Sequence, residues 1–302
     1  MPLAVRPLAD GIGAEVLSFN ASEPVSGSDQ VAIREALFEH LILVFRAQCL
    51  SIEQQIRFTE IFGAVEVSPD TRNAHPGDSR ILIVSNAQTG KTPRPSSSRY
   101  WHTDRSFVDK PSMTTLLHVL QVPARGGDTL YADMRKAYEL LSAATKARLE
   151  GLRARHSYQE SLEWLRRQQP WTVRRALETA GSGLARVVNG AGRRLRSAGA
   201  VHSSPRFPDV VHPLVRPHPV TGQKALYLNE VCVKAVEGLA EEESGALLHE
   251  LYGHALQPRF IYRHKWRPGD LVVWDNPSLM HRATETPPEC PRLLHRSTAA
   301  EA

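Results

Sequence analysis

The sequence predicts a mixed α+β fold, with a mixed sheet or barrel at its centre and helices that flank it. Short apolar runs typical of buried strands recur at uneven spacing along the chain. Turn residues separate several of them, as in Arg267-Pro268-Gly269-Asp270. Helical patterns occur between some of these runs but do not alternate regularly with them, so we do not expect repeated βαβ units.

The first helix is expected directly after Ser28. Four apolar residues recur there at helical spacing, and they are Val31, Ile33, Leu37 and Phe38. The pattern leads into residues 41–45, Leu-Ile-Leu-Val-Phe, which read as a short buried strand. Ser51 and Gln54 then have the spacing of a capping box, and the helix that they begin should end at Gly63.

The remaining elements are mostly strands. Residues 85–100, rich in Pro, Ser, Thr, Lys and Arg, predict a mobile loop. Strands are expected at Arg80–Val84, Met113–Leu120, Thr129–Ala132, Ala225–Leu228, Arg259–Tyr262, Asp270–Trp274 and Leu293–Ser297. Helices are expected at 134–150 and 240–252. No linker divides two patterned halves, so residues 1–302 are expected to form one domain.

Composition excludes several classes of protein. The chain has 302 residues, of which 41% are hydrophobic and 23% charged, which excludes a disordered or fibrous protein. No apolar run approaches the ~20 residues that span a bilayer, and the N-terminus has no secretory-signal pattern. The three cysteines are far apart and predict a reducing cytoplasm rather than a disulfide framework. Nucleotide-phosphate motifs are absent from the sequence.

The net charge of +5 comes from one segment. Residues 160–206 contain nine arginines and three glutamates, so the rest of the chain is close to neutral. A basic surface over the whole protein is therefore not expected, and this argues against a nucleic-acid-binding module.

One constellation of residues points to chemistry. His102 and Asp104 are two positions apart, so in an extended chain their side chains point to the same face. His281 can supply a third ligand from a distant strand. Two histidines and one carboxylate form the facial triad of non-haem Fe(II) oxygenases, with open positions for cosubstrate and O2. In a chain with 13 histidines a His-x-Asp pair alone is more often structural, so the surrounding residues decide.

Four separated motifs support the metal interpretation. In order they are Trp101–Phe107 (WHTDRSF), Gly126–Thr129 (GGDT), Trp274-Asp275-Asn276 followed by His281, and the pair Arg292 and Arg296. Together they resemble the taurine dioxygenase/chlorophenoxyacetate dioxygenase family of Fe(II)- and 2-oxoglutarate-dependent oxygenases. The resemblance runs from residue 5 to residue 298 and is weakest at 65–98 and 160–210.

The resemblance implies a double-stranded β-helix, which is a jelly-roll, cupin-like barrel with iron at its mouth. His102, Asp104 and His281 match the iron ligands of the family. Thr129 matches the threonine that contacts the distal carboxylate of 2-oxoglutarate, and Arg292 matches the arginine that pairs with it. A guanidinium suits this task because its planar fork meets a carboxylate through two N–H groups and keeps its charge. The implied cofactors are Fe(II), the cosubstrate 2-oxoglutarate and O2.

Two further residues bear on the reaction. Arg296 matches an arginine that approaches the anionic head of the substrate in founding members of the family. On a strand it shares a face with Arg292, four residues earlier. Related halogenases have a small residue at the position of Asp104, which leaves room for chloride. Because a carboxylate stands there, the expected reaction is hydroxylation of an unactivated C–H bond, with release of succinate and CO2.

The residues expected to contact substrate differ from those of the taurine enzyme. Its sulfonate-binding histidine aligns approximately with Ser68, although His75 is nearby. Its pocket serine and phenylalanine correspond to Ser161 and Leu162, and a later phenylalanine corresponds to Cys232. These differences argue against taurine and favour a bulkier small-to-medium organic anion. Cys232 also fits a plain role as a small buried residue.

The basic segment 160–206 has two main interpretations. It is a solvated amphipathic helix that covers the active site as a lid, or its arginine pairs, Arg166/Arg167 and Arg174/Arg175, steer an anionic substrate. That substrate could bear a phosphate or be attached to a carrier protein or coenzyme A. Contact with a membrane surface is a weaker third interpretation.

Other outcomes stay open at this point. The same chemistry can lead to desaturation or to cleavage of a C–S, C–O or C–N bond. A non-catalytic ligand-binding barrel is the alternative from another class, and the complete set of iron ligands argues against it. The resemblance also implies a homodimer or homotetramer.

Overall fold

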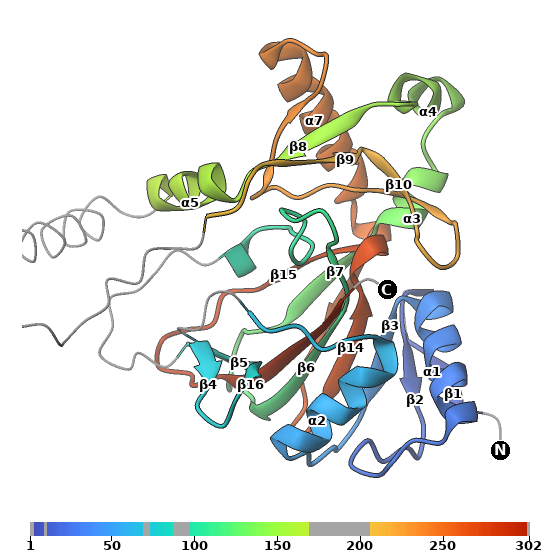
Figure 1. Cartoon of the computed structure of the whole chain (residues 1–302), viewed down its shortest axis with the longest axis vertical. Coiled ribbons are helices and arrows are strands. Elements are labelled where there is room, and N and C mark those ends of the chain that lie inside the picture. Colours follow the sequence, from blue (N-terminus) through green and yellow to red (C-terminus); the bar gives the residue numbers. More distant parts are fainter. Residues whose placement is uncertain (1–2, 9–10, 69–72, 87–96, 169–205, 301–302) are drawn as a thin grey trace, which may run out of the picture.

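The computed structural model describes residues 3–8, 11–68, 73–86, 97–168 and 206–300. Its largest sheet has eight strands in the order β1-β2-β3-β14-β6-β16-β5-β4 (Figure 1). These strands are Val5–Pro7 (β1), Ala14–Val16 (β2), Ile42–Phe45 (β3), Leu271–Asp275 (β14), Ser112–Gln121 (β6), Leu293–Ala300 (β16), Asp78–Ser85 (β5) and Ala74–His75 (β4). Neighbours pair antiparallel, except that β2 and β3 are parallel.

A second sheet faces the inner side of the first. Its strands, in the order β13-β7-β15, are Ile261–His264, Thr129–Asp133 and Leu279–Ala283. Because side chains alternate along a strand, Tyr131 and His281 point toward Trp274 of the large sheet, with ring centroids 5.5 and 4.8 Å from it. Ala132 and Met280 point the other way, into a separate apolar cluster. Tyr131 and His281 of the second sheet therefore lie with Trp274 of the large sheet in the space between the two sheets.

Two helices cover the outer side of the large sheet (Figure 1). They are α1 (Gly27–His40) and α2 (Ile52–Thr59), and α2 continues into a 3-10 turn, η2 (Glu60–Phe62). Leu37 and Phe58 pack on this side against Phe45 of β3. Ile42 and Val44 of the same strand point to the inner side. This alternation gives the sheet one apolar face for the helices and another for the interior.

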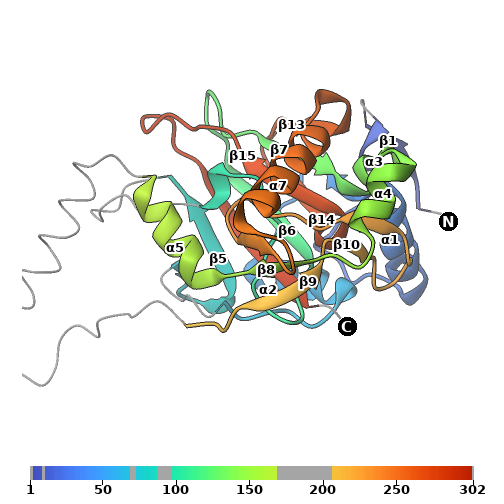
Figure 2. The ribbon, with the colours of Figure 1, turned by 90° about the horizontal axis from the view of Figure 1, so that it is seen from above.

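The remaining described elements are four helices, three 3-10 turns and two small sheets. The helices are α3 (Met134–Glu139), α4 (Ala143–Leu149), α5 (Tyr158–Arg167) and α7 (Glu241–Ala255), and the 3-10 turns are η4 (Ser97–Arg99), η5 (Pro258–Phe260) and η6 (Asn276–Ser278). Two small sheets have the orders β12-β8-β9 (Val233–Val236, Arg153–His156, Val210–Pro213) and β10-β11 (Val215–Pro217, Lys224–Leu226). In Figures 1 and 2, α5 and α1 lie at opposite sides of the molecule.

The N-terminal expectations are confirmed with small shifts. The first helix begins two residues early, because Ser26 rather than Ser28 accepts the backbone N–H of Asp29 as N-cap. The capping box of Ser51 and Gln54 is present. The helical turns after it end at Gly63, whose φ of 143° lies in a region that favours glycine. The mixed α+β class is confirmed as well.

Several later boundaries were wrong. The single helix predicted at 134–150 is two helices, because Ser142 accepts the N–H of Thr145 and begins a new one. The strand predicted at Arg259 begins at Ile261, since Pro258 starts a 3-10 turn. The strand predicted at Ala225–Leu228 ends at Leu226. The unpredicted strands are β1, β2, β4, β8, β9, β10, β12 and β15.

Two predicted features fall largely outside the described residues. They are most of the loop 85–100 and most of the basic segment 160–206, of which the structure describes α5, Gln168 and Arg206. Of the helices that are described, none combines the length and apolar character needed to cross a membrane.

Candidate active site

The three predicted metal ligands come together between the two sheets. His102, Asp104 and His281 each offer one ligand atom, and these atoms lie within 4.8 Å of one another. All three side chains are buried. The backbones of the two histidines are joined directly, because the N–H of each donates to the carbonyl of the other, at 3.1 and 2.8 Å. The chain is extended up to Thr103 and turns at Asp104, and the two side chains of the His-x-Asp pair still meet as predicted.

Neighbouring groups orient the ligand atoms. Nδ1 of His102 is 2.8 Å from the carbonyl of Tyr100. A carbonyl only accepts, so Nδ1 carries the proton and the lone pair is on Nε2. The hydroxyl of Thr115 donates to Oδ2 of Asp104 at 2.6 Å, and the amide of Asn276 donates to that hydroxyl at 2.9 Å. Strand β6, through Thr115, and turn η6, through Asn276, therefore hold the Asp104 carboxylate in place.

The electrostatics of the site favour neutral histidines and an ionised carboxylate. Burial lowers the pKa of His281 to about 3, and burial also lowers the pKa of His102. For Asp104 burial acts to raise the pKa, but the Arg296 guanidinium and the two histidines hold it below its ordinary value. At neutral pH the site thus offers two imidazole lone pairs and one negative charge.

This donor set fits a divalent metal ion. Neutral imidazole and ionised carboxylate are the protonation states that bind metals. Nε2 of His281 and Oδ2 of Asp104 are 3.9 Å apart, a separation that one ion at about 2.0–2.2 Å from each atom can bridge. Two histidines and one carboxylate are the facial triad typical of non-haem iron oxygenases.

Two residues that sequence reasoning missed hold the metal-binding segment from outside. The side-chain amide of Asn229 donates to the carbonyl of Thr103 and to the hydroxyl of Ser106, at 3.0 and 2.9 Å. The carboxylate of Glu230 accepts the N–H of Trp101 at 2.8 Å. Only the adjacent Asn-Glu pair could have drawn attention to them, and that pair has no diagnostic spacing. Their role follows from tertiary contacts across more than 120 residues.

The predicted cosubstrate residues lie on inner faces of the two sheets. Thr129 begins β7, and its hydroxyl accepts the indole N–H of Trp266 at 3.1 Å. Arg292 directly precedes β16 and is 8% exposed. It forms no ion pair with the described residues, and its Nε has no hydrogen-bond partner among them. Burial lowers the pKa of Arg292 to about 10, so it is still a cation at neutral pH. A buried cation without an ion pair is costly, so this position suits an anionic ligand.

The two glycines of the GGDT motif let the turn before β7 pass close to Arg292. Gly126 and Gly127 have φ values of 69° and 73°, which side chains other than glycine rarely adopt. A Cβ on Gly126 would lie 2.1 Å from the carbonyl oxygen of Glu285, and one on Gly127 would lie 3.1 Å from Cδ of Arg292. The glycines are therefore required where the turn before β7 passes the loop before β16.

Arg296 reaches the metal centre directly. Its Nη1 lies 3.4 Å from Oδ1 of Asp104, and 26% of its side chain is exposed. His295, the preceding residue, points to the other face of β16 because side chains alternate. The ring of His75 contacts His295, with centroids 5.2 Å apart. His75, considered above as a shifted alternative to Ser68, therefore lies away from the face that carries Arg296.

The predicted substrate residues are placed as follows. Ser161 and Cys232 are buried, and the Ser161 hydroxyl donates to the carbonyl of Tyr158 within α5. Leu162 and Ser68 are half-buried. Burial raises the pKa of the Cys232 thiol to about 11, as expected of a small buried residue.

An apolar wall connects α5 with the metal-binding segment. It consists of Leu165, Val231 and Cys232, with Tyr100, Phe107 and Trp164 packed against them. The rings of Tyr100 and Trp164 are in edge contact, with centroids 4.6 Å apart. Since the Tyr100 carbonyl orients His102, this wall adjoins the metal ligands. Leu162 is next to it in α5, whereas Ser68 follows η2 on another side.

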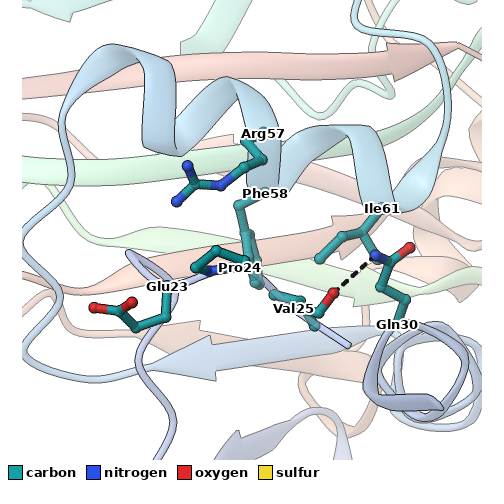
Figure 3. A pocket seen from close by; sticks show the side chains of 7 residues that line it. All are labelled: Glu23, Pro24, Val25, Gln30, Arg57, Phe58 and Ile61. Atoms are coloured by element: carbon teal, nitrogen blue, oxygen red, sulfur yellow. Dashed lines mark hydrogen bonds between the residues drawn. The ribbon is translucent and has the colours of Figure 1, made fainter. Parts of the chain in front are cut away.

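A small hollow of about 240 Å³ lies elsewhere, beside α2 (Figure 3). It is lined by Glu23, Pro24, Val25, Gln30, Arg57, Phe58 and Ile61. Phe58 and Ile61 belong to the apolar cluster on the outer side of the large sheet. The hollow is therefore separated from the metal ligands by the sheet and contributes no residue to them.

Comparisons with known proteins identify the family of this chain. Residues 4–298 match the family described as taurine catabolism dioxygenase TauD, TfdA family. The α-ketoglutarate-dependent 2,4-dichlorophenoxyacetate dioxygenase of Cupriavidus pinatubonensis is 31% identical over 100% of this chain and 99% of its own.

Solved structures agree with the sequence match. A taurine dioxygenase from Burkholderia xenovorans superposes with a TM-score of 0.77 at 27% identity, covering 100% of this chain and 90% of that one. The structure of AAD-2 in complex with Mn(II) and N-oxalylglycine gives a TM-score of 0.75 at 29% identity, over 100% of this chain and 98% of that one. The chain therefore belongs to the TauD, TfdA family and is an α-ketoglutarate-dependent dioxygenase whose metal site is His102, Asp104 and His281.

Proposed function

We propose that this dioxygenase hydroxylates an unactivated C–H bond of a small-to-medium organic anion. The overall reaction consumes the substrate, 2-oxoglutarate (α-ketoglutarate) and O2, and yields the hydroxylated product, succinate and CO2. Fe(II) held by the triad supplies the oxidising chemistry when it is bound. The protein itself binds, orients and shields the reactants.

Arg292 and Thr129 are proposed to bind the distal carboxylate of 2-oxoglutarate. The observation that supports this is the buried Arg292 guanidinium, which has no counter-ion among the described residues. Thr129 has already accepted a hydrogen bond from Trp266, so its own O–H is available to donate. Together they offer a charge and a hydroxyl donor to one carboxylate.

Arg296 is proposed to bind the anionic group of the substrate. It is paired with the metal ligand Asp104 and remains partly exposed, at 26% of its side chain. The compounds named for two relatives, 2,4-dichlorophenoxyacetate and taurine, both carry an acidic group. Ser68, Ser161, Leu162 and Cys232 are proposed to line the substrate position, in line with the apolar wall that includes Cys232. Such a wall suits an apolar or aromatic body behind the anionic head.

The finer description of the fold belongs to the same proposal. We infer that the two facing sheets form the double-stranded β-helix, and that residues 1–302 form one domain with a basic lid at 160–206. The inner positions of Tyr131 and His281 opposite Trp274 support the barrel. A single cooperative unfolding transition, seen alike by near-UV and far-UV circular dichroism, is expected for one domain, and two separate transitions would contradict it.

The test is a succinate-release screen. Fe(II)-loaded enzyme is incubated with 2-oxoglutarate, O2 and phenoxyalkanoates, other carboxylates, sulfonates, sulfate esters, amino acids and acyl thioesters. We expect succinate and hydroxylated product in equal amounts from at least one anionic compound. Arg296→Gln should raise the KM for that compound about tenfold or more, because a hydrogen bond from the guanidinium to the anionic group of the substrate is lost. Arg153→Gln, at a 52% exposed side chain, is the matched control.

The products also decide among the remaining outcomes. An alkene would indicate desaturation, and a released alcohol, amine or sulfite would indicate cleavage after hydroxylation at the adjacent carbon. Turnover of thioesters alone would indicate a carrier-bound or coenzyme A-bound substrate. A preference for uncharged compounds that Arg296→Gln leaves unchanged would contradict the anion assignment. Light scattering of the purified protein tests the expected homodimer or homotetramer.

A further inference from the structure

Tyr131 is a buried residue to which the reaction outlined above assigns no role. It lies two residues after Thr129 on β7, so both side chains point to the inner side of the strand. The intervening Leu130 and the following Ala132 belong to the cluster on the opposite side. Tyr131 is 0% exposed, and its ring packs beside His281 and Trp274.

The hydroxyl of Tyr131 has no hydrogen-bond partner among the described residues. It makes no hydrogen bond of ordinary geometry with any residue that the structure describes. The neighbouring Tyr262 provides a direct contrast, because its ring stacks on Tyr131 and its hydroxyl lies 3.1 Å from Nδ1 of His264. Buried hydroxyls without partners are uncommon in native proteins, and each calls for an absent ligand or water. A phenol near neutral pH is protonated and can donate.

The surroundings of this hydroxyl identify the missing partner as an anion. Burial raises the pKa of Tyr131, while the Arg292 guanidinium and the Thr129 side chain act against that increase, so both lie close to the phenol. Arg292 has no counter-ion among the described residues, and the Thr129 O–H is free to donate because its oxygen accepts from Trp266. Three donor groups thus lie near one another in a buried region, and the described residues provide no hydrogen-bond partner for the Tyr131 hydroxyl or for Nε of Arg292.

We propose that the Tyr131 hydroxyl donates a third hydrogen bond to the distal carboxylate of 2-oxoglutarate, beside Arg292 and Thr129. This rests on the cosubstrate site proposed above. A carboxylate has about four lone-pair sites. A bidentate guanidinium takes two of them and the threonine hydroxyl one, which leaves one for the phenol. Tyr131 is thus a cosubstrate-binding residue that the sequence motif does not include.

The test is an anaerobic titration of the Fe(II)-loaded enzyme with 2-oxoglutarate, followed by the visible charge-transfer band of the complex. Tyr131→Phe removes one oxygen and keeps the ring. We expect the Kd for 2-oxoglutarate to rise about tenfold, as for the loss of one hydrogen bond to a charged group. Tyr262→Phe is the matched control, because it removes a stacked tyrosine hydroxyl that already has a protein partner, and its Kd should change less than twofold.

A second ligand separates binding from general damage to the site. The compound 2-oxobutyrate has the same keto acid group but lacks the distal carboxylate. We expect Tyr131→Phe and the parent enzyme to bind 2-oxobutyrate equally. An unchanged Kd for 2-oxoglutarate, or an equal loss of affinity for both ligands, would overturn the role of Tyr131 and leave the proposed function standing. A parent enzyme that forms no band with 2-oxoglutarate would overturn both.

Discussion

The residues proposed to bind the cosubstrate lie on or next to strands, whereas those proposed to contact the body of the substrate, apart from Arg296 on β16, lie on a helix and in loops. Thr129, Tyr131 and Arg292 are on or next to β7 and β16, which are paired over their length within the two facing sheets. Ser161 and Leu162 are in α5, and Cys232 is in the segment before β12. On the proposed function, the first group binds the cosubstrate that the family shares, and the second group contacts the substrate, which differs among relatives.

The difference teaches where specificity can change. Residues on paired strands are held by backbone hydrogen bonds on both sides, so their geometry tolerates little variation. A helix edge and a loop can exchange side chains without disturbing those pairings. Leu162 and Cys232, at which the resemblance to the taurine enzyme implies the loss of aromatic rings, lie on this adaptable side. Four experiments test the contrast between the two sides.

Removal of a metal ligand should have the largest effect. His281→Ala is expected to lower kcat/KM about 1000-fold or more and to abolish the charge-transfer band with Fe(II) and 2-oxoglutarate. The matched control is His249→Ala, since His249 is exposed on α7. A variant at His281 that kept both the band and the activity would contradict the assignment of the triad.

Removal of the buried arginine should be second. Arg292→Leu is expected to raise the Kd for 2-oxoglutarate about 100-fold through loss of two charge-assisted hydrogen bonds. Without cosubstrate the variant should be no less stable than the parent, because an unpaired buried charge has been removed. Arg263→Leu is the control, as Arg263 is 55% exposed and paired with Asp128. A Kd within twofold of the parent would refute the role of Arg292.

Acid should destabilise the support of the substrate side through His156. This residue lies on β8 just before α5, and burial lowers its pKa from 6.5 to about 3. Below pH 6.5 the unfolded chain binds a proton there that the folded protein does not bind, so stability falls as the pH falls from 6.5 toward 3. At pH 4.5 the titration of His156 should make the free energy of unfolding about 2–3 kcal/mol lower than at pH 7.

Urea unfolding at pH 7 and pH 4.5 measures that loss. His156→Phe should lose about 2–3 kcal/mol less than the parent between the two pH values. An exposed histidine serves as comparison, and His249→Phe should leave the loss unchanged. Equal losses in the parent and His156→Phe would show that His156 does not set the acid sensitivity.

Charge reversal in the basic segment should have the smallest effect. Replacement of Arg166, Arg167, Arg174 and Arg175 by Glu is expected to raise KM about two- to fivefold at low salt, and less as salt screens the charges. Arg166 and Arg167 are exposed at the end of α5. The control is reversal of Arg148 and Arg153, which are exposed elsewhere. Unchanged kinetics at low salt would reject steering by this segment.

Much of the site could be predicted because its residues recur in fixed local patterns. The His-x-Asp pair puts two ligands two residues apart, and the GGDT turn needs two glycines because backbone and the Arg292 side chain approach them closely. Asn229 and Glu230 could not be predicted, since their contacts with Trp101 and Thr103 arise only when the chain has folded. Tyr131 was missed for a similar reason, because the lack of a partner is a property of its surroundings.

The fold was predictable where apolar runs were continuous. Strand β3, with four buried residues in succession, was predicted almost to the residue. Strand β8 (Arg-Ala-Arg-His) was missed because it is basic and short, although alternate residues, Ala154 and His156, are buried. Strand β15 (Leu-Met-His-Arg-Ala) was missed because its apolar run is only two residues long before His281 and Arg282.

The backbone bridge between His102 and His281 has a consequence for biosynthesis. Any N-terminal stretch of chain that ends before residue 281 contains at most two of the three ligands, and it also lacks both Arg292 and Arg296. A growing polypeptide therefore cannot assemble the full ligand set until β15 has been made and has paired with β7. The complete three-ligand site is in this sense a late product of synthesis.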